Sequence, residues 1–319
     1  MTRSAPRPGW TLAIVSLALF MTALDNLVVG VALPSIRNDL GGTIESLEWT
    51  VNAYTLAFAV LLITGAALGD RFGRKRVFIA GVSIFTGASA LAALAPSLDA
   101  LVAARALQGL GAAMVTPLTL TLLSEAFPPE KRGVALGIWG GISGLGVAIG
   151  PLVGGAVVQG IAWQWIFWIN VPVGLALIPL ANRFLSESRG PDSALDLRGL
   201  LLAGGGLFGL VFGIIRGEPL GWTSATVMTS IGSGLVLLAA FVGWELRARE
   251  PMLPMRLFRS RAFSATNALS FTMFFGTFGA IFLLSQFFQT GQGYGPLEAG
   301  LRTLPWTGMP MTVAVGYRL

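Results

Sequence analysis

The sequence predicts an all-α integral membrane protein, and its composition, mean hydropathy and apolar patterning all support this. Hydrophobic residues make up 54% of the 319 residues, charged residues make up 11%, and the mean hydropathy is +0.74. A typical soluble domain carries about 25% charged residues, so this chain has too few to cover a globule with hydrated side chains. Its apolar residues form continuous runs rather than the short alternating segments of a membrane β-barrel. The chain therefore needs lipid as its solvent.

The types of charged and reactive residue exclude several functions. The net charge of +6 does not indicate a nucleic-acid partner, because the basic residues fall in short connections between apolar runs, where they set membrane topology. The sequence has no Cys and no His, which excludes disulfides and thiolate or imidazole metal sites. We therefore expect no metal and no cofactor, and any proton chemistry must use carboxylates.

Ten apolar segments are long enough to span a bilayer as helices, since a span needs about 20 residues. Arg3 and Arg7 precede the first segment, but its length favours a retained helix over a cleaved signal peptide. Pro305 and Pro310 interrupt the last segment, at which the chain stops. The predicted spans are residues 10–33, 47–68, 77–95, 99–123, 134–158, 164–184, 197–216, 224–244, 263–289 and 297–319.

The basic residues predict the orientation of these spans. Connections on one side of the predicted spans hold most of the Lys and Arg, whereas the other side holds Arg37, Arg216 and Arg302. Basic loops stay in the cytoplasm, so we expect a multi-pass protein of the inner (plasma) membrane with a cytoplasmic N-terminus.

The two longest connections on the basic side divide the chain. They cover about 185–197, rich in Ser, Pro and charge, and 245–262. We expect a six-helix bundle (1–190), an inserted two-helix hairpin with cytoplasmic linkers (191–250), and the start of a second, incomplete bundle (251–319). The hairpin is almost purely apolar and Gly-rich, which favours a scaffolding role.

Asp25 lies deep in the first predicted span, and Arg105 lies one to two turns into the fourth. Each costs about 2.5–3.5 kcal/mol at a helix centre, so each is a functional candidate. Asp25 could alternate between a proton and a cationic substrate, because burial favours the neutral acid and a nearby cation favours the carboxylate. The alternative is a carboxylate that holds two helices together. Arg105 could tune that acid, or could bind backbone carbonyls between helices.

Other polar side chains are candidates for a substrate cavity. Gln108 and Thr116 share a face with Arg105 at helical spacing, and Asn26 and Tyr54 lie in the first two spans. Interior amides such as Asn170 more often form helix–helix hydrogen bonds than ligand contacts. We therefore take Asn26, Tyr54, Gln108 and Thr116 as cavity candidates, with helix packing as the alternative.

Two glycine patterns indicate close packing or movement. Gly146, Gly150 and Gly154 recur every four residues in the fifth span and so form one groove, with Pro151 and Gly155 beside them. This groove could be a seam that flexes, or it could be static packing. Between the second and third spans, Asp70 and Arg71 between Gly69 and Gly73 predict a tight turn with a charge pair at a helix end, which could lock one conformation. The alternative is that the basic residues there serve only topology.

Together these motifs resemble the major facilitator superfamily, and in particular its fourteen-helix branch of drug/proton antiporters. The resemblance runs in order over nearly the whole chain, although Gln164 stands where that branch has Arg. It rests on residues 24–34, 65–76, 105–111, 146–155 and 163–174.

The resemblance implies a major facilitator fold and export of amphipathic, often cationic compounds by exchange for protons. It makes Asp25 and Arg105 proton-coupling residues and implies two motifs. The cytoplasmic gate motif comprises Gly65, Gly69, Asp70, Arg71, Gly73 and Arg74, and the antiporter helix motif comprises Gly146, Gly150, Pro151, Gly154 and Gly155.

The chain holds about ten of the fourteen helices of that branch, so we expect it to be truncated at its C-terminal end. A truncated, non-transporting membrane protein is therefore one alternative. A proton symporter or uniporter for a small solute is another.

Overall fold

The computed structural model describes residues 7–190, 196–248, 251, 253–295, 298 and 301–302, and every regular element in these ranges is helical. Seven candidate membrane spans lie among them, judged by length and composition. In chain order the elements are α1 (Pro8–Leu40), α2 (Ile44–Phe72), α3 (Arg74–Ala93), α4 (Leu98–Ala126), α5 (Pro129–Gly160), α6 (Trp165–Trp168), α7 (Asn170–Phe184), α8 (Leu197–Leu220), α9 (Ala225–Glu245), η1 (Met255–Arg259), α10 (Arg261–Gln286) and η2 (Phe287–Gly291).

The all-α prediction is confirmed, and the helices coincide with the predicted segments from the first to the ninth. The sixth segment differs from the prediction, because it is divided at Ile169 into the single turn of α6 and the longer α7. The tenth segment, 297–319, lies outside the described residues except for Glu298, Leu301 and Arg302.

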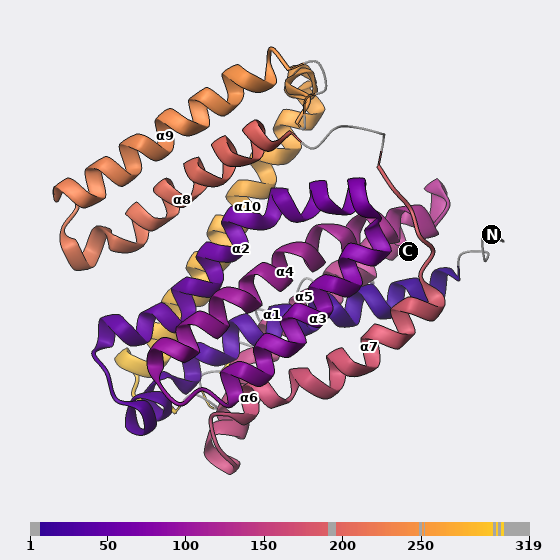
Figure 1. Cartoon of the computed structure of the whole chain (residues 1–319). Helices are drawn as coiled ribbons and strands as arrows, with labels where there is room; N and C mark the ends of the chain where they lie inside the picture. Colours follow the sequence, from indigo (N-terminus) through magenta and orange to yellow (C-terminus); the bar gives the residue numbers. More distant parts are fainter. Residues whose placement is uncertain are drawn as a thin grey trace.

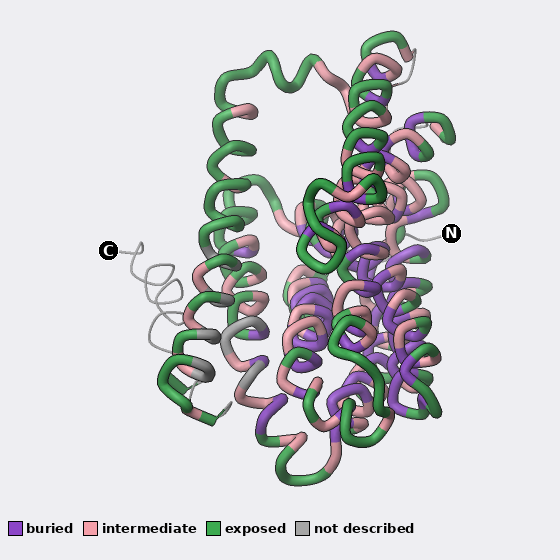
Figure 2. Tube along the Cα trace, turned by 90° about the vertical axis from the view of Figure 1, so that its left-hand side faces the viewer, coloured by how far each residue is buried: buried purple, intermediate pink, exposed green. Residues whose placement is uncertain are grey.

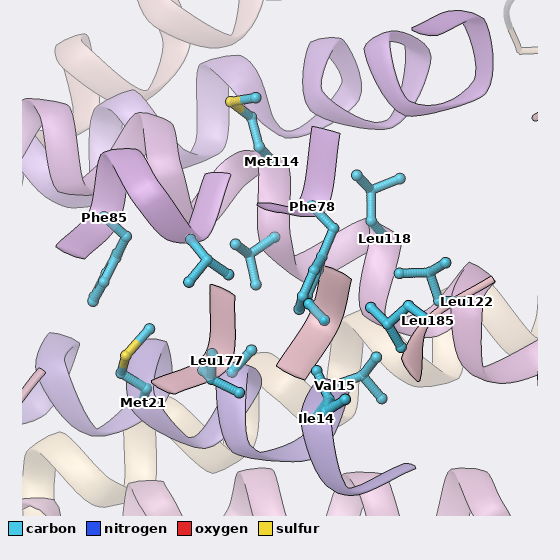
Figure 3. Packing of buried hydrophobic residues seen from close by; sticks show 14 of the residues in the cluster. Ile14, Val15, Met21, Phe78, Phe85, Met114, Leu118, Leu122, Leu177 and Leu185 are labelled. Carbon is cyan, nitrogen blue, oxygen red and sulfur yellow. The ribbon is translucent and has the colours of Figure 1, made fainter. Parts of the chain in front are cut away.

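Helices α1 to α7 pack into one bundle (Figure 1). Its core has one cluster around Phe78, Leu118 and Leu177, part of which Figure 3 shows. A second cluster, around Ile36 and Leu101, lies along the same helices. Lipid tails are as apolar as leucine, so close packing and interhelical hydrogen bonds hold such helices together more than expulsion of water does.

Glycines on α4 allow its neighbours to approach on both sides. A Cβ at Gly109 would overlap the backbone carbonyl of Tyr54 on α2, and one at Gly111 would lie 2.7 Å from the backbone nitrogen of Phe85 on α3. Helix α4 is therefore the centre of the bundle, and its polar residues face both neighbours.

The later helices lie outside this bundle. Helices α8 and α9 pair with each other, and α8 also lies along α2 (Figure 1). Arg216 of α8 forms an ion pair with Glu45 of α2. Buried residues gather within the bundle (Figure 2). By contrast, Leu269 and Phe271 of α10 are 70% and 73% exposed.

The glycine groove of α5 packs against α1. A Cβ at Gly150 would lie 2.9 Å from the Cβ of Leu27, and one at Gly154 would lie 3.2 Å from the Cα of Val28. The side chain of Pro151 lies outside the described residues. The groove thus faces the turn of α1 that contains Asp25.

A substitution in this groove should destabilise the bundle. We expect Gly150→Val to lower the free energy of unfolding in detergent by about 1–3 kcal/mol more than Gly144→Val does, because overpacking strains the contact with α1. Gly144 is a matched control on the same helix, since nothing lies within 4 Å of a Cβ there. Equal losses for the two variants would show that the groove is not closely packed.

Candidate functional site

Asp25 and Arg105 form an ion pair inside the bundle. Nη1 of Arg105, on α4, lies 2.5 Å from Oδ2 of Asp25, on α1, and both side chains are 0% exposed. Neither charge is solvated by water, so each depends on the other and on nearby dipoles. The two charges that the sequence places within the membrane are therefore one structural unit.

Two amides complete the shell of the carboxylate. Oδ1 of Asp25 accepts hydrogen bonds from Nδ2 of Asn170 (2.7 Å) and from Nε2 of Gln108 (3.1 Å). Oγ of Ser89 on α3 in turn accepts from Gln108 at 2.8 Å and from Asn170 at 3.4 Å. Asp25 thus accepts three hydrogen bonds, from Arg105, Gln108 and Asn170. All three donors are N–H groups, which is the arrangement that an ionised carboxylate needs.

Arg105 has further partners that fix its position. Its Nε donates to the backbone carbonyl of Thr50 at 2.9 Å, and its Nη1 donates to Oε1 of Gln108 at 2.8 Å. Its guanidinium carbon lies 4.4 Å from the ring centre of Tyr54 and 5.8 Å from that of Phe167. Nη2 is buried and has no hydrogen-bond partner among the described residues. Because Arg can only donate, it also fixes which end of the Gln108 amide faces Asp25.

The structure joins some predicted residues and leaves others apart. Tyr54 and Gln108, predicted as cavity residues, belong to this network, and the expected helix–helix hydrogen bond of Asn170 is confirmed. Asn26 and Thr116 are half-buried, and no described hydrogen bond joins their side chains to the network. Sequence reasoning missed Ser89, since the same apolar helix also holds Ser83 and Thr86 and nothing in the sequence distinguishes Ser89 from them.

The turn between α2 and α3 is a second polar cluster. Gly73 alone separates the two helices, with φ of 111°. Asp70 pairs with Arg74, whose Nε and Nη2 lie 2.8 Å and 2.7 Å from Oδ1 of Asp70, and Arg74 also pairs with Glu125 of α4. The tight turn was predicted correctly, but the expected partner of Asp70 was not. Arg71 instead points outward, over the ring of Phe72.

The segment after α7 crosses this turn. The backbone nitrogens of Arg74 and Gly190 donate to the carbonyls of Ser188 (2.9 Å) and Asp70 (3.0 Å). The carboxylate of Glu187 accepts from the backbone nitrogen of Lys75 at 3.0 Å. The turn is therefore fastened to both α4 and the end of α7.

Glycines in the part of α2 that precedes this turn also bring α2 close to α4. A Cβ at Gly65 would overlap the carbonyl of Ala113, and one at Gly69 would overlap the side chain of Leu118. These two positions of the predicted gate motif are therefore required for packing in the present conformation.

Comparison with known proteins identifies the family of the chain. The family model described as Major Facilitator Superfamily matches residues 15–319. The tetracenomycin C resistance and export protein of Streptomyces glaucescens is 39% identical over 95% of this chain and 57% of its own length. The multidrug resistance protein Stp of Mycobacterium tuberculosis is 38% identical over 93% of this chain and 56% of its own. The puromycin resistance protein pur8 of Streptomyces alboniger is 37% identical over 98% of this chain and 62% of its own.

The chain thus spans a little over half the length of these curated relatives. A solved structure of a peptide transporter, POT, in complex with sulfate aligns with a TM-score of 0.56 at 16% identity, covering 76% of this chain and 53% of that one. At that identity the likeness concerns the fold alone.

The mutual dependence of Asp25 and Arg105 can be measured with a double-mutant cycle. We expect Asp25→Asn and Arg105→Gln each to lower the free energy of unfolding in detergent by about 3–5 kcal/mol, because each leaves a buried charge without its partner. The double variant should lose much less than the sum of the two.

The matched control is the partly exposed pair Glu45–Arg216, whose coupling should be at most about 1 kcal/mol. Additive losses at Asp25 and Arg105 would contradict the ion pair.

Proposed function

Because the chain belongs to the Major Facilitator Superfamily, we propose that it acts in proton-coupled export of amphipathic, drug-like and often cationic compounds. The single observation that carries the coupling is the ion pair between Asp25 and Arg105, buried where a charge is costly. The names of the relatives, which are antibiotic resistance and export proteins, support the direction and the substrate class.

Asp25 is the proposed proton carrier. When it is ionised, its oxygens accept from Arg105, Gln108 and Asn170. A proton on Oδ1, the oxygen that faces Asn170, would remove the charge that holds Arg105, so the contact between α1 and α4 would weaken. A cationic substrate near Asp25 would favour the ionised form and release the proton. Proton and substrate then compete for one carboxylate, which is the requirement for exchange.

Asn170 is the proposed sensor of this protonation. A protonated Asp25 needs an acceptor for its new O–H. Gln108 cannot turn its oxygen toward Asp25 without losing its bond from Arg105. Asn170 makes no hydrogen bond to Arg105, so its amide can turn and leave that side of the network intact.

The turn between α2 and α3 is the proposed cytoplasmic gate. Its ion pairs from Arg74 to Asp70 and Glu125 would form in one conformation and separate in the other. In this scheme, closely packed helix surfaces slide or seal as the gate opens and closes. These surfaces are formed by Gly65 and Gly69 of α2 against α4, and by the groove of Gly146, Gly150 and Gly154 of α5 against α1. This assignment places the N-terminus in the cytoplasm of a plasma-membrane protein.

We also retain the proposed division of the chain. Residues 1–190 form the first bundle, 191–250 the inserted hairpin, and 251–319 the beginning of the second bundle. In this scheme the substrate path lies between the bundles, and Asn26 and Thr116 remain candidates for its lining.

Loss of the Asp25 carboxylate should uncouple transport. In vesicles containing the natural protein, we expect Asp25→Asn to abolish substrate accumulation driven by a pH gradient. Exchange of labelled for unlabelled substrate should persist, because that step needs no net proton movement. Asp99→Asn, at an exposed carboxylate in the first turn of α4, is the matched control and should keep both activities. Normal accumulation by the Asp25 variant would refute the coupling role.

Loss of the Asn170 amide should move the pH profile. Asn170→Ala removes one of the three N–H donors to Asp25, so it should change the pH at which transport is half-maximal. Among the described side chains around Asp25, the guanidinium of Arg105 carries a charge and the hydroxyl of Tyr54 can titrate. The Asn170→Ala substitution leaves both groups in place. Asn182→Ala, on the same helix but exposed, should leave the profile unchanged. A lower maximal rate at an unchanged pH midpoint would assign Asn170 a structural role only.

A further inference from the structure

The start of α1 and the end of α7 meet through an aromatic stack. The rings of Trp10 and Phe184 lie 4.4 Å apart and are inclined by only 5°. Trp10 lies in the first turn of α1, and Phe184 is the last residue of α7. Both helices belong to candidate membrane spans, so the stack lies where two spans emerge at the same membrane surface.

Two arginines converge on this stack. The guanidinium carbons of Arg7 and Arg183 lie 5.4 Å and 5.6 Å from the ring centre of Phe184. No carboxylate among the described residues forms an ion pair with either one. The acidic residue closest in sequence, Glu187, is bound instead to the start of α3. Two cations are thus held near one ring without an anion between them.

The surroundings favour a lipid as that anion. Both arginines are exposed, and Trp10 is 46% exposed. Tryptophan at the end of a span sits at the level of the lipid headgroups, so the two guanidinium groups are at phosphate depth. Arginine binds phosphate through two parallel N–H donors, and basic pockets between spans bind anionic headgroups. If Arg7 and Arg183 served only to set membrane topology, they would need to lie on one side of the membrane. They would not need to converge on the ring of Phe184.

We propose that Arg7 and Arg183, positioned by the stack of Trp10 and Phe184, form a binding site for the phosphate of an anionic phospholipid. The headgroup would bridge the two guanidinium groups and offset their repulsion. Its acyl chains would lie along α1 and α7. The bound lipid would then fasten the first span to the end of the seventh helix. This site depends neither on the direction of transport nor on which face of the membrane it occupies.

The test is lipid retention by the whole protein. Protein purified in detergent would be mixed with equal amounts of phosphatidylglycerol and phosphatidylcholine, and the bound lipid counted by native mass spectrometry. We expect phosphatidylglycerol to be preferred, and the double variant R7Q/R183Q to lose about tenfold in its affinity for that lipid. The variant R7K/R183K keeps the charge but not the paired donors, so it should retain an intermediate affinity.

The matched control is R256Q/R259Q, which removes two exposed arginines from η1 and should bind phosphatidylglycerol like the wild type. Thermal unfolding of each variant in lipid-free detergent shows whether it is folded, and the lysine variant provides a second test if the glutamine variant is not. Equal retention by wild type and R7Q/R183Q would overturn the proposal. So would displacement of the lipid by millimolar inorganic phosphate, which would indicate a simple anion site.

Discussion

The buried ion pair between Asp25 and Arg105 is the constraint on which the rest of the bundle depends. A charge within the membrane is costly, and a pair offsets that cost only if its remaining donors and acceptors are also satisfied. Here the partners come from several helices: the carbonyl of Thr50 on α2, Ser89 on α3, Gln108 on α4 and Asn170 at the start of α7. The relative position of these helices is therefore fixed by one polar centre as well as by apolar packing.

Close packing and the polar centre support each other. Gly109 lets α2 approach α4, which brings the Thr50 carbonyl and the Tyr54 ring within reach of Arg105. On the other side, Gly150 lets α5 approach the turn of α1 next to Asp25. A change in either contact would alter the shell of the ion pair. This is how a single proton could be linked to a movement of whole helices, since packed interfaces shift between discrete arrangements rather than deforming gradually.

Much of this arrangement could be predicted from the sequence, but the contacts between helices could not. Apolar runs give the spans, and a charge inside a run marks Asp25 and Arg105 without any knowledge of their pairing. The pairing depends on how each helix is rotated, which is decided by contacts along its whole length. Ser89 was missed for that reason. The partner of Asp70 was also mispredicted, because Gly73 ends α2 and begins α3, so helical spacing does not determine which Arg faces Asp70. The turn brings Arg74 of α3, not Arg71, to Asp70.

The ionisation of Asp25 tests the central claim most directly. Infrared difference spectra of the natural protein in membranes at neutral pH, wild type minus Asp25→Asn, isolate the signal of this one carboxyl group. An ionised Asp25 that accepts hydrogen bonds from Arg105, Gln108 and Asn170 predicts a carboxylate band in that difference. It also predicts that this band is replaced by a protonated carboxyl band when the pH is lowered. A protonated band at neutral pH that does not respond to pH would contradict both the ion pair and the proposed exchange of a proton for a substrate.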